Sequence, residues 1–242
     1  MQNNYIRGIV LSNIDQQHYP YDIPAVAQIE KIKFDSPVTF LVGENGMGKS
    51  TIVEAIANAA GFSSEGGTKN IHFTTYNSTS KLSDSIKLIR GSKRERDGYF
   101  LRAESFYNVA SYMEEPNPEG PLRYGGKVMH DQSHGESFMW LINHRFLGNG
   151  IYILDEPESA LSPQRQLTLL YTMNKLIKNG SQFIISTHSP ILLSYPEATI
   201  YQLSQDGIDK KEYDELESVN LYRDFLNNKS HFIDKLFNIK EI

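Results

Sequence analysis

The chain has 242 residues, of which 39% are hydrophobic and 22% are charged, and its formal net charge is −5. This length allows one large domain with a sizeable core, and no stretch approaches the ~18 apolar residues of a membrane span. The negative balance argues against attraction of nucleic acid over the whole surface, although a local basic patch could still bind it.

Two further absences narrow the class of protein. The chain has no cysteine, which excludes disulfides and thiolate metal sites. Its opening, MQNNYIRGIVLSN, lacks the basic start and long apolar region of a signal peptide. We therefore expect a cytoplasmic protein without a membrane segment of its own.

The first part of the chain is predicted to contain mainly strands. We predict strands over residues 5–11, 28–34 and 38–42, a proline-bounded loop over 18–24, a helix from Lys49 through Ile56, an exposed and mobile turn over 61–70, and two strands of one hairpin over 85–89 and 99–103.

Helices and strands alternate in the remainder. We predict a helix over residues 106–113, a proline-rich break over 114–121, a helix over 137–147, a buried strand over 151–154, a helix over 163–178, strands over 182–186 and 199–203, and amphipathic helices from Asp214 onward. Strands that alternate with helices indicate an α/β fold with a mostly parallel sheet covered by helices.

The most informative motif is the segment GENGMGKST, which follows directly on the apolar strand 38–42. It fits the pattern G-x-x-x-x-G-K-[ST], in which backbone N–H groups and a helix N-terminus bind phosphates. Lys49 is expected to reach the β/γ-phosphates of ATP, and the Ser50 hydroxyl to bind Mg²⁺. The expected nucleotide-binding residues here are Gly43, Glu44, Asn45, Gly46, Met47, Gly48, Lys49, Ser50 and Thr51. The alternative is a glycine-rich turn before an ordinary helix.

Two acids follow the apolar strand 151–154. In a parallel sheet, ligands bind at the carboxyl ends of the strands, so Asp155 and Glu156 should emerge beside the phosphate-binding loop. Asp155 can hold Mg²⁺, and Glu156 can activate the attacking water as a general base. The alternative is an acid pair that caps the strand end.

A histidine follows the next buried strand, 182–186. The imidazole of His188 can hydrogen-bond the γ-phosphate and sense its loss. A lone histidine is more often structural, and the position of His188 at the end of a third strand favours a role in the site.

From about Tyr5 to His188 these motifs resemble the ABC-class ATPases, and the resemblance implies a P-loop NTPase fold of two lobes, with a mostly parallel central sheet and an antiparallel β lobe. In that family a signature motif at a helix N-terminus contacts the nucleotide of a second subunit. By similarity, Ser133, Gly135 and Glu136 would do so here, although Gln132 and His134 depart from the family's leucine and first glycine. Residues 159–162 fall at the family's D-loop, and they are equally explained as the turn before a helix at Pro163.

The resemblance also implies a head-to-tail homodimer formed on ATP binding. It divides the single domain, 1–242, into a β-rich lobe with the phosphate loop (1–103), a helical signature region (104–147) and a C-terminal region with the acids and the histidine (148–242).

Spacing and residue types favour one branch of the family. Between Lys49 and Ser133 there is no room for the coiled-coil arms of chromosome-maintenance proteins. Transporter subunits place a glutamine in this interval, and none occurs between Thr51 and Asp131. The motifs most resemble small soluble ATPases of the AAA-21-like and recombination-repair group. We therefore expect an ATPase switch that acts on a nucleic-acid or protein partner, with the nucleotide-binding subunit of a membrane transporter as the alternative.

Three weaker features keep two readings each. Glu104 either faces the Mg²⁺ side of the site or forms a strand-end ion pair. The basic turn around Lys93 and Arg94 either grips nucleic-acid phosphates or is a solvated tip, and Tyr19 or Tyr21 either stacks on adenine or packs as an ordinary tyrosine.

Overall fold

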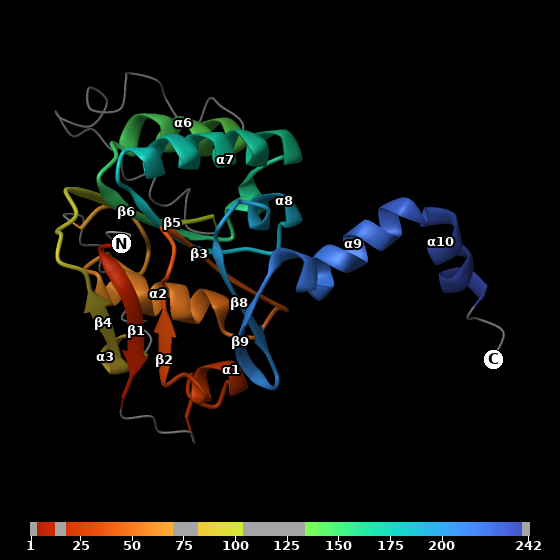
Figure 1. Ribbon diagram of the computed structural model, residues 1–242, viewed down its shortest axis with the longest axis horizontal. Helices are drawn as coiled ribbons and strands as arrows, with labels where there is room; N and C mark the ends of the chain where they lie inside the picture. The colour runs from red at the N-terminus through yellow and green to blue at the C-terminus, as the bar shows by residue number, and fades with distance from the viewer. Residues whose placement is uncertain (1–3, 13–17, 70–81, 104–133, 239–242) are drawn as a thin grey trace.

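The computed structural model describes residues 4–12, 18–69, 82–103 and 134–238 (Figure 1). The strands are β1 (Ile6–Leu11), β2 (Lys31–Lys33), β3 (Val38–Gly43), β4 (Ile86–Arg90), β5 (Asp97–Arg102), β6 (Gly150–Asp155), β7 (Gln182–Ser186), β8 (Thr199–Ser204) and β9 (Gly207–Lys211). The helices are α1 (Pro24–Ala27), α2 (Lys49–Ala59), α3 (Leu82–Ser85), α6 (His134–Arg145), α7 (Pro163–Lys178), α8 (Pro190–Leu193), α9 (Glu217–Asn227) and α10 (Lys229–Asn238), with short 3₁₀ helices at Pro157–Ala160 and Tyr213–Glu215.

The strands form two sheets. The central sheet has the order β5-β6-β7-β3-β8-β9, in which all neighbours are parallel except β8 and β9. The second sheet has the order β2-β1-β4 and is antiparallel throughout. This confirms the predicted α/β fold of P-loop NTPase type, with a mostly parallel central sheet and an antiparallel β lobe.

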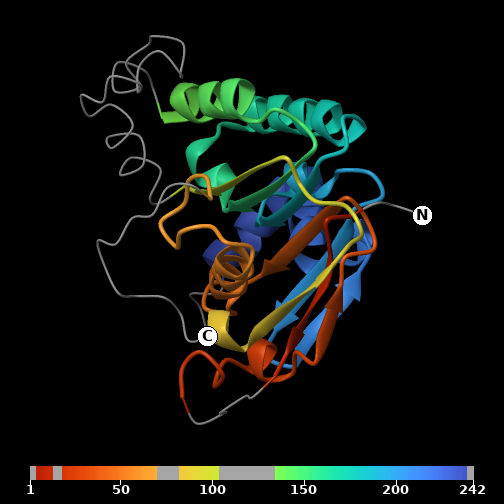
Figure 2. The ribbon, with the colours of Figure 1, turned by 90° about the vertical axis from the view of Figure 1, so that its left-hand side faces the viewer.

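Alternation of side chains along β3 explains how the layers are held together. Phe40 and Val42 point into a core shared with α6, α7 and α8, whereas Leu41 points into a second core shared with α2 and the antiparallel sheet. All three side chains are almost fully buried. The central sheet is thus covered by α6 and α7 on one face, and α2 fills the space between the two sheets (Figures 1 and 2).

A buried glutamine at the start of β7 ties the two sheets together. The Gln182 side chain accepts a hydrogen bond from the Ile6 backbone N–H at 3.0 Å and donates one to the Ile6 carbonyl oxygen at 2.7 Å. With 1% of its surface exposed, Gln182 uses its amide on both polar groups of one β1 residue. These two hydrogen bonds therefore connect β1 of the antiparallel sheet to β7 of the central sheet.

The predicted hairpin between 85–89 and 99–103 is wrong. β4 pairs with β1 in the antiparallel sheet, whereas β5 pairs with β6 in the central sheet. The connection between them therefore passes from one sheet to the other. The basic turn lies on this crossing, where Arg90 and Lys69 both pair with Glu95.

Several boundaries also differ from the predictions. The strand expected over 28–34 is only β2, because α1 occupies Pro24–Ala27 and ends at Gln28. The turn expected to be exposed over 61–70 is partly buried in its described part, since Phe62 enters the core and Gly67 bridges to Phe100. α6 starts three residues earlier than predicted, at His134. The helix over 163–178 and the strand over 182–186 are confirmed as predicted.

Some predictions lie outside the described residues. These are the helix over 106–113, the break over 114–121, and the roles of Glu104 and Ser133.

The C-terminal helices α9 and α10 extend away from the rest of the protein (Figure 1). In the part of the chain that the structure describes, no helix has both the length and the apolar character needed to cross a membrane.

Candidate active site

The order of strands in the central sheet brings the predicted motifs together. β3 lies beside β7, and β7 lies beside β6, so the carboxyl ends of these three parallel strands are neighbours. In register, Asp155 lies opposite Ser186, and Leu41 lies opposite Ser186 on the other side. The phosphate-binding loop, the acids and the histidine therefore converge at one edge of the sheet, as the sequence predicted.

The loop between β3 and α2 has the conformation of a phosphate cradle. Gly48 precedes α2 in the left-handed region, at φ 88° and ψ 11°, which a glycine adopts without steric cost. As the N-cap residue, Gly48 provides no side-chain cap for the first N–H groups of α2. This arrangement suits an anion at the helix N-terminus.

Lys49 is held inside this loop. Its side chain is 4% exposed, and Nζ donates a hydrogen bond to the Glu44 carbonyl oxygen at 3.1 Å and lies 3.8 Å from Oε1 of Glu156. Burial lowers the pKa of Lys49, although Glu156 and Asp155 act in the opposite direction. The amine therefore already lies between the loop and the predicted general base.

Asp155 is buried at the end of β6. Its Oδ1 accepts a hydrogen bond from the Ser186 hydroxyl at 2.5 Å, and its Oδ2 lies 3.4 Å from Nε of Arg102. Burial raises the pKa of this carboxyl, while the Ser186 hydroxyl, Arg102 and a hydrogen bond from Ser50 oppose the rise. The two predicted metal ligands, Ser50 and Asp155, are thus in contact.

These oxygen donors fit a magnesium ion. Mg²⁺ in nucleotide sites is held by one or two protein oxygens together with substrate phosphates. A hydroxyl and a carboxylate that meet beside a phosphate cradle provide that donor set. Ser50 and Asp155 would hold the ion.

Glu156 and His188 face each other across the site. Nε2 of His188 lies 3.4 Å from Oε1 of Glu156 and makes no hydrogen bond with any described residue, although this nitrogen is shielded from solvent. The Glu156 N–H is anchored by the backbone oxygen of Ser186 at 3.1 Å. Both side chains are about one-third exposed, so a ligand can reach them.

Glu158 is a site residue that the sequence analysis missed. Its Oε1 accepts a hydrogen bond from the backbone N–H of His188 at 2.5 Å. Burial raises the pKa of Glu158, against the effect of the His188 N–H and the Thr187 hydroxyl. The link to His188 is tertiary, because it joins the turn after β6 to the turn after β7, and no local pattern indicates it.

Arg102 is a second residue whose place was not predicted. It stands opposite Asp155 in the β5–β6 register, and its guanidinium contacts Glu54 of α2 at 2.8 Å as well as Asp155. Once β5 is known to pair with β6, this position follows from the register. Because β4 and β5 were predicted to form a hairpin, the contact between Arg102 and Asp155 was not predicted.

The described part of the predicted signature lies beside the predicted D-loop of the same chain. A Cβ placed on Gly135 would come within 2.9 Å of the Ala160 carbonyl oxygen, and Glu136 pairs with Arg165 at 3.1 Å. Ser162 caps α7 by accepting a hydrogen bond from the Arg165 N–H at 3.4 Å. Gly135 and Glu136 both lie in the first turn of α6.

Of the two candidate adenine contacts, only Tyr19 remains suitable. Tyr19 as a whole is 63% exposed, and its hydroxyl lies 3.3 Å from the Thr51 hydroxyl on α2. Tyr21 is buried and hydrogen-bonded to Ser85, so its ring has no free face for a base.

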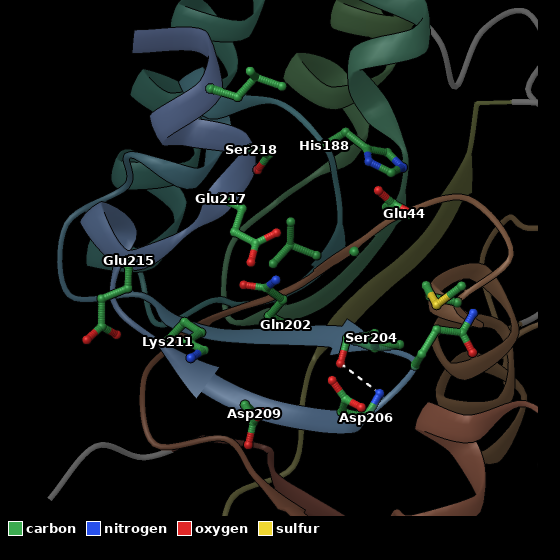
Figure 3. Close-up of a pocket in the computed structure, with 16 residues that line it drawn as sticks. Glu44, His188, Gln202, Ser204, Asp206, Asp209, Lys211, Glu215, Glu217 and Ser218 are labelled. Atoms are coloured by element: carbon green, nitrogen blue, oxygen red, sulfur yellow. Dashed lines mark hydrogen bonds between the residues drawn. The ribbon is translucent and has the colours of Figure 1, made fainter. Parts of the chain in front are cut away.

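A cavity of about 690 Å³ opens beside the phosphate-binding loop, between Glu44 and His188 on one side and β8, β9 and α9 on the other (Figure 3). Its charged lining is mainly acidic and consists of Glu44, Asp206, Asp209, Glu215 and Glu217, with Lys211 and His188. An acidic cavity repels a polyphosphate. We therefore expect the phosphates to lie over the loop and the N-terminus of α2 rather than in this cavity.

The fold is that of P-loop NTPases of the ABC-ATPase type, and the predicted motifs converge at one edge of its central sheet. A sequence profile of the AAA_21 family, described as "AAA domain, putative AbiEii toxin, Type IV TA system", matches residues 138–194, which run from α6 to the end of α8. No curated protein matches the chain.

Solved structures with this fold are similar over most of the chain. The likeness to cbiO1 from Clostridium perfringens, part of the ABC transporter complex cbiONQ, has a TM-score of 0.54 at 16% identity and covers 96% of this chain and 99% of that chain. A "putative metal-chelate type ABC transporter" in an inward-facing conformation has a TM-score of 0.51 at 16% identity, and the match covers 88% of this chain and 86% of that chain. The SMC head domain from Thermotoga maritima gives 0.48 at 15% identity, with coverage of 86% and 99%. At these identities, the two structures with TM-scores above 0.5 share only the fold with this chain.

Proposed function

We propose that this protein binds ATP with Mg²⁺ and hydrolyses it to ADP and phosphate. The observation that carries the proposal is the convergence of Lys49, Asp155, Glu156 and His188 at the ends of three adjacent parallel strands. Each of these side chains suits one task in phosphoryl transfer, where positioning and electrostatic stabilisation supply most of the rate.

The proposed roles follow from the contacts. The loop 43–51 binds the phosphates, and Lys49 exchanges its contact with Glu156 for the β/γ-phosphates. Glu156 then accepts a proton from the attacking water, and Nε2 of His188 steadies the γ-phosphate. Ser50 and Asp155 would hold Mg²⁺, which when bound would neutralise charge on the phosphate oxygens.

We further propose that hydrolysis takes place in a head-to-tail homodimer in the cytoplasm. By family resemblance, Ser133, Gly135 and Glu136 of one subunit would contact the nucleotide of the other. ATP would hold the dimer together and hydrolysis would release it, so that a nucleic-acid or protein partner is moved or released in each cycle.

The second candidate is the nucleotide-binding subunit of a membrane transporter. It is favoured by the likeness to cbiO1, whose description makes it part of an ABC transporter complex. Purification from native membranes and from soluble extract separates the two candidates. Co-purification with an integral membrane protein would favour the transporter.

The proposed chemistry is tested with Glu156→Gln, which keeps the shape of the side chain and removes the base. We expect release of phosphate to fall by at least about 100-fold, because a general base contributes about that much. ATP binding should persist, and light scattering should detect an ATP-dependent dimer. Glu217→Gln, in the neighbouring acidic cavity, is the matched control and should leave hydrolysis unchanged.

Hydrolysis at the wild-type rate in Glu156→Gln would show that Glu156 is not the base. If the wild-type protein binds ATP and dimerises but releases no phosphate, the protein is an ATP-gated assembly module rather than an enzyme.

A further inference from the structure

The antiparallel sheet carries four exposed cations, Arg7, Lys31, Lys33 and Lys87, which we call the basic face. Arg7 lies at the register shift between Ile6 and Gly8, and it lines the same depression as Lys31 and Lys33. In the strand register, Lys31 and Lys87 stand on either side of Val10, and Lys33 stands opposite Gly8. Because cross-strand partners share a face of the sheet, the three lysines project from the same surface. Adjacent strands are about 4.8 Å apart, so Lys31 and Lys87 are separated by about 10 Å across β1.

The basic face is separate from the nucleotide site. Ile32 and Ile86 are next in sequence to basic positions, and Ile9 lies opposite Ile32 in the register. All three are buried and pack with α2 in the same core. The opposite surface of β2, β1 and β4 therefore points away from α2 (Figures 1 and 2).

Within the described part of the chain, ion pairs do not balance the charge of these cations. Among the described residues, none of the four forms an ion pair, and the nearby Asp35 is already bridged to Lys210 at 3.3 Å. Arg90, at the end of the same sheet, is by contrast paired with Glu95. A group of unpaired like charges in a chain of net charge −5 costs folding energy and creates a local positive potential.

The surface is also hollowed. A depression of about 500 Å³ is lined by Arg7, Lys31 and Lys33, by the acid Asp35, and by the uncharged residues Asn4, Phe34 and Ile89. The Asn4 amide is committed to the carbonyl oxygens of Phe34 and Ser36, both at 2.8 Å. The depression thus offers positive charge and little that could read a base sequence.

Protection of sheet edges explains only part of this pattern. Lysines on β2 and β4 discourage pairing with another sheet, because both are edge strands. Arg7, however, is on the central strand β1, where no edge needs protection. Binding of an anionic ligand would explain why Arg7 is exposed on the central strand.

We infer that the basic face binds the phosphate backbone of a nucleic acid. This deepens the proposed function, because it selects nucleic acid among the partners on which the ATPase could act. Four cations spread over three strands match a row of phosphates rather than one isolated anion, and phosphate contacts of this kind bind without sequence preference. A membrane surface fits less well, because membrane binding by such a patch also requires large exposed apolar side chains. The apolar residues Val10 and Ile89 at this face are only partly exposed.

The test measures binding of a fluorescent 25-base-pair duplex of arbitrary sequence to the full chain by anisotropy, without nucleotide. If about four phosphates are neutralised, tripling the salt concentration should weaken the affinity of the wild-type protein roughly 50-fold. Lys31→Glu/Lys33→Glu should weaken binding at least tenfold at low salt and reduce the slope of log affinity against log salt by about 2. Both residues are exposed, so phosphate release without DNA should be unchanged.

The matched control is Lys229→Glu/Lys235→Glu, which changes the net charge equally at two exposed residues of α10. It should change the affinity less than about threefold, since these lysines lie outside the basic face. Equal losses in the two double variants would overturn the inference in favour of an overall charge effect. Absence of wild-type binding at low salt would overturn it as well.

A parallel sedimentation assay uses vesicles that contain phosphatidylserine. If the wild-type protein binds the vesicles and not the duplex, the basic face serves a membrane and the inference fails. Failure of the ATPase proposal is measured separately by phosphate release, which leaves the duplex result unaffected.

Discussion

Glu156 occupies a backbone conformation that an L-residue adopts only at a cost. Its φ of 48° and ψ of 53° lie in the left-handed region, which disfavours a side chain by about 1–2 kcal/mol. The turn places the carboxylate within reach of both Lys49 and His188. Local strain at such a position is typical of groups that must be held in one orientation.

At the residue scale we predict that Glu158 positions His188 through its acceptor oxygen and not through its charge. Glu158→Ala leaves the partly buried His188 N–H without its partner, which costs about 1–3 kcal/mol, so kcat for ATP hydrolysis should fall about tenfold. Glu158→Gln keeps a carbonyl oxygen in the same place and should remain within about twofold of the wild type. Steady-state kinetics with both variants should show KM for ATP unchanged. A loss in Glu158→Gln as large as in Glu158→Ala would assign the role to the carboxylate charge instead.

At the scale of elements, the helices, strands and loops that are determined by residues close together in the sequence were predicted well. The phosphate-binding loop after β3, the acids at the end of β6 and the helix α7 follow from local pattern. Pairing of β4 and β5 does not, because two strands joined by a short turn look like a hairpin whichever sheets they enter. Arg102 and Glu158 escaped prediction for the same reason, since their partners are set by the order of strands and not by spacing along the chain.

The close approach of β3 to β8 gives a prediction about the start of the phosphate-binding loop. A Cβ on Gly43 would lie 2.4 Å from the Leu203 carbonyl oxygen, whereas one on Gly46 would meet nothing within 4 Å. Both glycines have positive φ, 155° at Gly43 and 83° at Gly46, so Gly46→Ala tests a strained backbone without a steric clash. We expect Gly43→Ala to lower the melting temperature by about 5 °C more than Gly46→Ala, because ~2 kcal/mol corresponds to roughly that shift at this size. Equal shifts of the melting temperature in the two variants would mean that β8 moves away from the new methyl group without loss of stability.

At the scale of the whole molecule, the two sheets are held as one unit by α2 and by Gln182. This arrangement supports our proposal that residues 1–242 form a single domain, with 1–103, 104–147 and 148–242 as its parts. The antiparallel lobe and the C-terminal region meet through the bonds between Gln182 and Ile6.

We therefore predict that Gln182→Leu destabilises the whole fold. It removes two buried hydrogen bonds to the backbone of Ile6, and the expected loss in free energy of unfolding is about 2–4 kcal/mol, measured by urea denaturation. Gln164→Leu, on the exposed surface of α7, makes the same chemical change and should cost less than about 0.5 kcal/mol. Similar values for the two variants would show that Gln182 does not fasten the sheets.

The position of β3 has a consequence for synthesis on the ribosome. Both hydrogen-bonded neighbours of β3, namely β7 and β8, come from the last third of the chain. When Lys49 has just emerged from the ribosome, the partner strands of β3 have not yet been synthesised. Long-range pairing of this kind is also slow. Competence for nucleotide must arise late in translation, and a fragment that ends before Ser204 should be a substrate for chaperones rather than a smaller ATPase.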